Sequence, residues 1–267
     1  MATAPIRFDD GAAYERFMGL WSQRVGQAFL DWLSPPPGGQ WLDVGCGNGA
    51  FTERLVAECS PDSIDGIDPS EGQLAYARRR PALQAATLQT GDAMALPYAD
   101  DSFDAAVMPL VIFFVPEPRR GVLEMARVVR LGGIVSAYAW DMMEGGFPYF
   151  PLQAAMREMG LTVPAPPSPE ASRLDTLREL WTDAGLVEVE TQVITVERTF
   201  TDFDDYWTTV LGGPSVGATL ATMTPAAVAD LQSRLRAALV EDSDGRITCS
   251  GRANAVTGRV ASNGAHG

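Results

Sequence analysis

The chain has 267 residues, of which 46% are hydrophobic, so it is long enough to bury the core of a large globular domain. The formal net charge is −14, and because phosphate groups repel an acidic surface we expect neither nucleic acid nor an anionic membrane as a partner. Three cysteines without CxxC spacing argue against a disulfide framework or a zinc site, and a single histidine, His266, argues against triads and metal sites that need one.

The sequence also bears on the location of the protein. Residues 1–10 lack the basic start and apolar core of a signal peptide, and no apolar run is long enough to cross a bilayer. We therefore expect a cytoplasmic protein that binds no membrane and no metal. Residues 262–267 are expected to form a disordered tail.

The first predicted element is a helix over residues 9–34, where apolar side chains recur at i, i+3 and i+4. Packing is the expected role of most of this face, but Tyr14 and Trp21 also carry polar atoms that can point at a ligand. Prolines and glycines at residues 35–39 end the helix.

A strand, a glycine-rich turn and a helix follow. The apolar run WLDV stops at Gly45, Gly47 and Gly49, after which helical spacing begins. Such a turn lets the backbone approach a ligand closely, and Asp43 inside a buried strand needs a partner. This segment is therefore the centre of the predicted site.

Strands continue to alternate with helices as far as residue 140. Ser70 is expected to cap the second of these helices, and Gly132 and Gly133 to end the third. The predicted strands are residues 41–44, 63–68, 86–91, 103–108 and 134–140, and the predicted helices are residues 50–59, 71–80 and 118–130.

The pattern beyond residue 140 is less regular. The predicted helices there are residues 150–159, 170–184, 202–211 and 225–240, and the predicted strands are residues 187–198 and 245–256. Helices inserted between late strands of a sheet can cover its ligand site, so we expect them to form a lid.

These alternations indicate parallel βαβ units with helices on both faces. We predict an α/β fold: a Rossmann-like, doubly wound, seven-stranded and mostly parallel sheet with an N-terminal helical cap and helical insertions forming a lid. Ligands of such sheets bind beyond the carboxyl ends of the strands. The expected parts are a cap (1–39), a cofactor-binding core (40–140), the remaining sheet with the lid (141–261) and a tail (262–267).

The glycine turn also satisfies the loose dinucleotide pattern G-x-G-x-x-A, with Asp68 at the distance expected for a ribose contact. However, Asp43 beside the glycines would repel a pyrophosphate and attract a cationic amine. Asp92 and Ala93, after the next strand, suit a purine edge, and the turn contains no Lys or Arg. S-adenosylmethionine, which is cationic at one end and carries ribose and adenine, fits these features.

Four segments in order resemble class I S-adenosylmethionine-dependent methyltransferases. Residues 42–49 (LDVGCGNG) and 65–70 (DGIDPS) resemble the first two motifs of this family. Residues 91–104 (GDAMALPYADDSFD) and 124–133 (EMARVVRLGG) resemble segments of its ubiquinone-biosynthesis-like branch, methyltransferase type 11. The resemblance is specific for cofactor and fold rather than for the substrate.

The resemblance implies the roles of the site residues. Asp43 and the backbone of the glycine turn would hold the methionine end, Asp68 the ribose hydroxyls, and Asp92 with the Ala93 N–H the adenine. Glu124 and Arg127 are interpreted as a helix-surface pair. With Tyr14 and Trp21 included, the predicted cofactor-binding residues are Tyr14, Trp21, Asp43, Gly45, Cys46, Gly47, Asp68, Pro69, Ser70, Asp92, Ala93, Met94, Met108 and Pro109.

The expected reaction is in-line methyl transfer to a small apolar or aromatic molecule, driven mainly by positioning. The catalytic residues stay open, with Tyr14, Asp141, Glu144 and Tyr206 as candidate bases. Apolar residues replace the histidines that many family members carry after the fourth strand, and Phe113 and Phe114 suit either core or pocket. The residues that suggest an apolar acceptor pocket are Met142, Met143, Phe147, Tyr149, Phe150, Trp207 and Leu211.

Two alternatives remain at this point: an NAD-dependent oxidoreductase, and a protein that binds S-adenosylmethionine without transferring its methyl group. The expected oligomeric state is a monomer or a homodimer.

Overall fold

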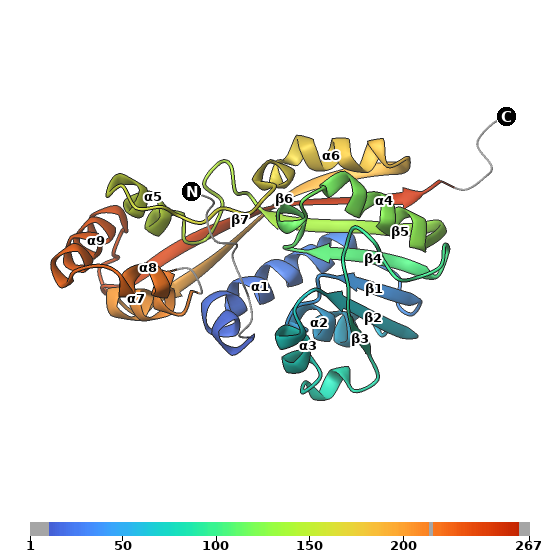
Figure 1. Cartoon of the computed structure of the whole chain (residues 1–267), viewed down its shortest axis with the longest axis horizontal. Coiled ribbons are helices and arrows are strands. Elements are labelled where there is room, and N and C mark those ends of the chain that lie inside the picture. The colour runs from blue at the N-terminus through green and yellow to red at the C-terminus, as the bar shows by residue number, and fades with distance from the viewer. Residues whose placement is uncertain (1–10, 214–215, 262–267) are drawn as a thin grey trace.

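The computed structural model of the protein describes residues 11–213 and 216–261 (Figure 1). A seven-stranded sheet in the order β3-β2-β1-β4-β5-β7-β6 runs through it. The strands are β1 (Gln40–Val44), β2 (Ser63–Asp68), β3 (Thr87–Thr90), β4 (Phe103–Pro109), β5 (Val129–Trp140), β6 (Leu186–Phe200) and β7 (Ile247–Val260).

Helices cover both faces of the sheet. In Figure 1, α1, α2 and α3 lie on one side, and α4 and α6 lie on the other. The helices are α1 (Gly11–Leu33), α2 (Ala50–Cys59), α3 (Glu71–Ala77), α4 (Pro118–Val128), α5 (Phe150–Glu158), α6 (Leu174–Asp183), α7 (Phe203–Leu211), α8 (Val216–Ala221) and α9 (Pro225–Ala238), with 3₁₀ turns η1 (Pro81–Leu83), η2 (Ile112–Phe114) and η3 (Pro169–Ser172).

The predicted fold class is confirmed. β1 pairs in parallel with β2 and β4, β2 with β3, and β4 with β5. Only β7 is reversed, since it runs antiparallel to both β5 and β6. The carboxyl ends of β1, β2, β3 and β4 therefore meet at one edge, where the glycine turn lies.

The last two strands reach beyond the rest of the sheet. β7 pairs with β5 only from Ala253 onward, but it pairs with β6 as far as Ile247. The projecting hairpin carries α5, α7, α8 and α9 around its far end (Figure 1). These helices are the insertions expected between the late strands, with α8 as an addition that the sequence pattern did not predict.

The boundary between α4 and β5 differs from the prediction. The helix ends at Val128, and Val129 already pairs with Phe103 in the sheet, so Gly132 and Gly133 do not cap the helix. They lie instead in an irregular part of β5, where Gly132 has a φ of 78°. A Cβ atom at Gly133 would lie 2.5 Å from the Asp104 carbonyl oxygen, so the close approach of two strands requires a glycine there.

Other predicted elements agree with the structure to within a few residues, except that the predicted helix over residues 170–184 starts only at Leu174, after η3. The predicted tail lies outside the described residues. Among residues 11–213 and 216–261, no helix combines the length and the apolar character that crossing a bilayer requires.

Candidate active site

Three glycines shape the turn between β1 and α2, and all three have positive φ, with values of 79° at Gly45, 53° at Gly47 and 78° at Gly49. A Cβ atom at Gly45 would lie 2.4 Å from Val111, and one at Gly49 would lie 2.6 Å from Leu83, so packing requires both glycines. The space at Gly47 is open, because the nearest atoms would be 4.0 Å from an added Cβ. Gly47 is therefore the point where a ligand can approach the backbone.

Asp43 is a buried carboxylate with one unpartnered oxygen. Its side chain has no exposed surface, and its Oδ2 accepts a hydrogen bond from Thr52 Oγ1 at 2.7 Å. Its Oδ1 has no partner among the described residues. Burial, aided by the negative charge of Asp68, raises its pKa to about 7 although the Thr52 bond opposes the shift. A cationic group arriving at Oδ1 would satisfy this oxygen and stabilise the carboxylate.

Asp68, at the end of β2, is held by backbone amides. Its Oδ2 accepts from the Gly47 N–H at 2.9 Å and its Oδ1 from the Ser70 N–H at 2.8 Å. Ser70 caps α3 as predicted, since its side chain accepts from the Gln73 N–H. Burial raises the pKa of Asp68, and the two amide bonds limit the rise. Each carboxylate oxygen keeps a lone pair that can accept from a ribose hydroxyl.

The loop after β3 lies beside this carboxylate. The Gly91 N–H donates to the Asp68 carbonyl at 3.2 Å, and exposed Asp92 accepts from the Met94 N–H at 2.8 Å. The Ala93 carbonyl and the buried Met108 side chain from β4 both lie within 4 Å of a Cβ built at Gly121. The predicted residues from β2, β3 and β4 are thus brought together at one edge.

Glu124 and Arg127 do more than pair on a helix surface. The Arg127 guanidinium donates to Glu124, to Asp100 and to the Leu96 and Tyr98 carbonyls, and Glu124 accepts from the Leu96 N–H. These bonds fasten the loop that follows Asp92 to α4. The pair therefore has a positioning role for the adenine side of the site.

Three further residues were predicted to bind the cofactor: Cys46, Trp21 and Tyr14. Cys46 is buried against Gly66, and burial together with the charges of Asp43 and Asp68 raises its pKa. Trp21 is fully buried and its indole N–H donates to the Tyr149 hydroxyl at 3.0 Å, so its polar atom is used inside the protein. Tyr14 lies on α1, but its side chain is outside the described part of the structure.

An ion-pair network that the sequence did not predict ties α1 to the glycine turn. Glu15 accepts from the Asn48 side chain at 2.9 Å and from Arg80 at 3.1 Å. Arg80 also donates to the Asn48 carbonyl and to Glu53, each at 2.7 Å. The partners come from α1, the turn, α2 and the residue before η1, and no local pattern links such separate segments.

A cavity of about 110 Å³ lies next to this edge. Leu110 lines the cavity, while its neighbour Val111 packs on Gly45, so the segment after β4 separates the cavity from the turn. Leu110 has an unusual φ of 59°, and its N–H donates to the Tyr138 carbonyl at 2.7 Å. Most lining residues are apolar: Phe17, Met18, Leu110, Phe113, Phe114, Trp140, Met142, Phe147, Tyr149, Leu152, Gln153, Met156, Val163, Pro164, Pro166, Gly213 and Val216.

The predicted acceptor pocket is present with a partly different lining. Met142, Phe147 and Tyr149 line it, and so do Phe113 and Phe114, for which core and pocket had been equal alternatives. Met143, Phe150, Trp207 and Leu211 are outside this lining. Met143, Phe150 and Leu211 are exposed instead, each by more than a third of its surface.

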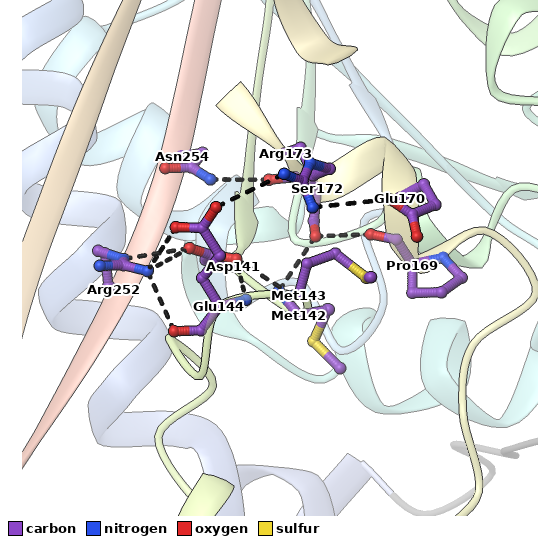
Figure 2. Close-up of polar contacts among 10 residues, drawn as sticks. All are labelled: Asp141, Met142, Met143, Glu144, Pro169, Glu170, Ser172, Arg173, Arg252 and Asn254. Atoms are coloured by element: carbon purple, nitrogen blue, oxygen red, sulfur yellow. Dashed lines mark hydrogen bonds and ion pairs between the residues drawn. The ribbon is translucent and has the colours of Figure 1, made fainter. Parts of the chain in front are cut away.

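Three of the four candidate bases are poorly suited to that role, and the side chain of the fourth, Tyr14, lies outside the described part of the structure. Asp141 is buried and engaged: Arg252 donates to its Oδ2 at 2.6 and 3.1 Å, and the Met143 and Glu144 N–H groups donate to its Oδ1 (Figure 2). Glu144 is exposed, and its carboxylate lies 3.4 Å from the same Arg252. Burial raises the pKa of Tyr206, which opposes deprotonation, and Tyr206 is outside the cavity lining.

The polar cluster of Figure 2 fixes the loop after β5 instead. Ser172 accepts from the Met142 N–H at 3.0 Å, and Asn254 donates to the Ser172 carbonyl at 2.8 Å. Together with the Asp141–Arg252 pair, these bonds hold η3 and β7 against the loop. The loop carries Met142 and Phe147 into the cavity wall, so the polar cluster positions two residues that line the predicted acceptor pocket.

The reversed β7, the strand order and the glycine turn after β1 define a Rossmann-like fold of the class I methyltransferase type. Residues 42–137 match the sequence profile of the family described as "Methyltransferase domain". The resemblance predicted from the motifs is thereby confirmed, and this segment is an S-adenosylmethionine-dependent methyltransferase domain.

Similar proteins agree with this assignment. The chain is 41% identical over 93 residues to 2-methyl-6-phytyl-1,4-hydroquinone methyltransferase 2, chloroplastic, of Oryza sativa subsp. japonica. The aligned segment makes up 35% of this chain and 27% of the relative. The chain is also 36% identical over 118 residues to a ubiquinone/menaquinone biosynthesis C-methyltransferase of Roseobacter denitrificans, and this aligned segment makes up 43% of this chain and 46% of the relative. The chain thus spans less than half the length of these relatives.

Structural similarity extends further along the chain. Phosphoethanolamine N-methyltransferase 2 of Haemonchus contortus, solved in complex with S-adenosyl-L-methionine, matches with a TM-score of 0.58 and 19% identity. The match covers 94% of this chain and 56% of that chain. At this identity the likeness concerns the fold.

Proposed function

We propose that the protein transfers a methyl group from S-adenosylmethionine to a small aromatic or otherwise apolar acceptor. The observation that carries this proposal is the unpartnered Oδ1 of buried Asp43 beside the open backbone of Gly47. A cationic ligand end fits there, whereas a pyrophosphate would meet two buried carboxylates, Asp43 and Asp68. The same features disfavour the NAD-dependent alternative.

The predicted contacts of the carboxylates and of the glycine turn then have a physical basis. Asp43 and Gly47 bind the methionine end, and Asp68, held by two backbone amides, accepts from the ribose hydroxyls. Asp92 and Ala93 hold the adenine from the loop that the Glu124–Arg127 pair fastens to α4. Pro69, Ser70 and Met94 are assigned to the adenine side of the cofactor, and Met108 and Pro109 are assigned to the end that carries the methyl group.

When bound, the cofactor supplies the electrophilic methyl group and a neutral leaving group. The task of the chain is to orient the acceptor in line with that group and to exclude water. Leu110 and the Phe113–Phe114 pair do this from the cavity side, because they lie on either side of Val111, which packs on Gly45. Asp141 acts through Arg252 as a positioning residue rather than as a base.

The acceptor class is inferred from the cavity. Its lining is almost entirely aromatic and aliphatic, which suits a flat apolar ring and not a charged metabolite. The hydroquinones named for the rice relatives have this character, but the aligned segments cover only 35% of this chain. An aromatic hydroquinone or naphthol is therefore the proposed acceptor class on the strength of the cavity itself.

The test is methyl transfer from isotopically labelled S-adenosylmethionine to two groups of acceptors. One group contains hydroquinones and naphthols, and the other contains glycine, ethanolamine and other charged small molecules. We expect labelled product from the first group. Transfer only to the second group contradicts the proposed acceptor class, and cofactor binding without any transfer favours the non-catalytic alternative. The cytoplasmic location, the oligomeric state and the division into cap, core and lid stay predictions.

A further inference from the structure

Trp140, at the end of β5, is a buried tryptophan whose N–H has no acceptor. The other buried indoles are satisfied: Trp21 donates to Tyr149, Trp41 to the Gly38 carbonyl at 3.1 Å, and Trp181 to the Val135 carbonyl at 2.8 Å. Trp140 is only 2% exposed, and its Nε1 has no partner among the described residues. A buried donor without an acceptor is costly, so this N–H calls for an explanation.

The position of the Trp140 ring suggests an explanation for its unpartnered N–H. Trp140 lines the apolar cavity, and its ring meets that of Trp21 edge to face at 6.4 Å between centroids. A Cβ built at Gly251 on β7 would lie 3.0 Å from Cζ3 of Trp140. Because Cζ3 and Nε1 are on opposite edges of an indole, the N–H lies on the edge of the ring that is remote from Gly251. Leu110 and Phe113, from the segment after β4, line the same cavity as Trp140.

Other polar groups of the cavity are differently placed. The Tyr149 hydroxyl accepts from Trp21 and donates to the Phe17 carbonyl at 2.7 Å, so its proton is already used. Gln153 lies on α5, and its Oε1 accepts from Arg157 at 3.4 Å. Trp140 therefore combines a place in the cavity lining with an N–H that has no acceptor among the described residues.

We propose that the Trp140 Nε1–H forms a subsite for one oxygen atom, carbonyl or phenolic, of a flat apolar ligand. An indole N–H is a donor only, so it recognises a hydrogen-bond acceptor and gains nothing from a plain hydrocarbon. The subsite rests on the proposed function, because it orients the acceptor in the cavity. It makes Trp140 a specificity-determining residue that selects oxygenated rings.

The test compares two probes with the same ring, 1-naphthol and naphthalene, by calorimetric titration of the full chain saturated with S-adenosylhomocysteine. We expect 1-naphthol to bind about threefold to tenfold more tightly, which is the range of one net hydrogen bond. The Trp140→Phe variant keeps an aromatic ring in the wall and should bind both probes equally. Trp181→Phe is the matched control: it removes a buried indole bonded to Val135 and should keep the preference for 1-naphthol.

A second readout is independent of affinity. In ¹⁵N-labelled protein, the indole N–H signal absent from Trp140→Phe should shift downfield with 1-naphthol and much less with naphthalene. Equal binding of the two probes to the native chain, or no such shift, overturns the subsite and leaves the apolar acceptor cavity intact. Failure of both probes to bind contradicts the proposed acceptor class and the subsite with it, while retained S-adenosylhomocysteine binding still supports the cofactor site.

Discussion

The edge of β1–β4 and the cavity beneath the late insertions recognise ligands in different ways. At the edge, carboxylates and glycine backbone dominate, and Asp43, Gly47 and Asp68 lie within 25 residues of one another in sequence. In the cavity, apolar side chains come from α1, η2, the loop after β5, α5 and α8, which are far apart in the chain. A constant cofactor can thus be bound by short motifs, whereas the acceptor is bound by packing among distant segments.

The matched family profile follows the same division. The matched family profile covers residues 42–137, whereas most of the cavity lining lies after residue 137 or in α1. Changes in the two regions should therefore affect the two ligands separately, and the following predictions depend on that separation.

The largest expected effect is on cofactor binding by Asp43→Asn. The amide retains the shape and the Thr52 bond but loses the charge, so affinity for S-adenosylhomocysteine should fall by about 100-fold or more. Binding of 1-naphthol should change little. Calorimetry measures both, and Asp175→Asn on the exposed surface of α6 controls for the change in net charge. An unchanged cofactor affinity contradicts the role given to Asp43.

The two glycines of the turn should respond differently to alanine. Gly45→Ala places a Cβ atom 2.4 Å from Val111 at a positive φ, so it should lower the free energy of unfolding by about 2 to 5 kcal/mol. Gly47→Ala meets open space and should cost only about 1 to 2 kcal/mol, for its positive φ. Its main effect should be weaker cofactor binding. Urea unfolding and calorimetry of the two variants separate packing from ligand approach, and equal losses of stability would contradict the distinction.

The arrangement of the loop after β5, which lines the cavity, depends on the ion pair between Asp141 and Arg252. Arg252→Met leaves buried Asp141 without its cation and should lower the free energy of unfolding by about 1 to 3 kcal/mol. It should also weaken 1-naphthol binding, because the loop that bears Met142 and Phe147 loosens, while cofactor affinity stays the same. Arg173→Met is the control, since its contacts to Glu144 and Glu170 are 3.6 and 4.0 Å long and exposed. Equal effects of the two variants in urea unfolding would contradict the positioning role.

The smallest expected effect concerns pH. Burial raises the pKa of the Asp43 carboxyl from its ordinary value of 3.8 to about 7, so the folded chain holds this proton more tightly than the unfolded chain. Its contribution to stability is full below pH 3.8 and is lost as the pH rises through 7. Cofactor binding has the opposite trend because it needs the carboxylate, and affinity should fall about tenfold per unit below pH 7.

Asp43→Asn should remove that part of both pH profiles. Asp68 shifts in the same direction and is retained, so a weaker dependence should remain in the variant. Stability and affinity measured between pH 5 and pH 8 check the signs, and a native affinity that increases on acidification would contradict the assignment.

The sequence was sufficient to predict the core of the sheet and the polar half of the site. Local patterns were enough there, because each carboxylate lies within two residues of the end of a strand and each glycine stands in a turn. The Glu15–Asn48–Arg80 network and the cavity could not be predicted in this way. Phe113 and Tyr149 become neighbours of one cavity only when the η2 turn, the loop after β5 and α1 are packed together.

Two errors have similar physical causes. The glycines at 132 and 133 resemble a helix C-cap in sequence, but tertiary pairing of Val129 with Phe103 draws the chain into the sheet first. Trp21 carries a polar atom suited to a ligand, but the Tyr149 hydroxyl, 128 residues away, accepts its hydrogen bond. Contacts between distant segments decided both cases.

Calorimetric titration of the full chain with S-adenosylhomocysteine and with NADH distinguishes the possible ligands of the glycine turn. We expect saturable binding of S-adenosylhomocysteine that Asp43→Asn abolishes or greatly weakens, and no heat of binding with NADH. Binding of NADH without binding of S-adenosylhomocysteine would contradict the assignment of the turn to a methyl donor.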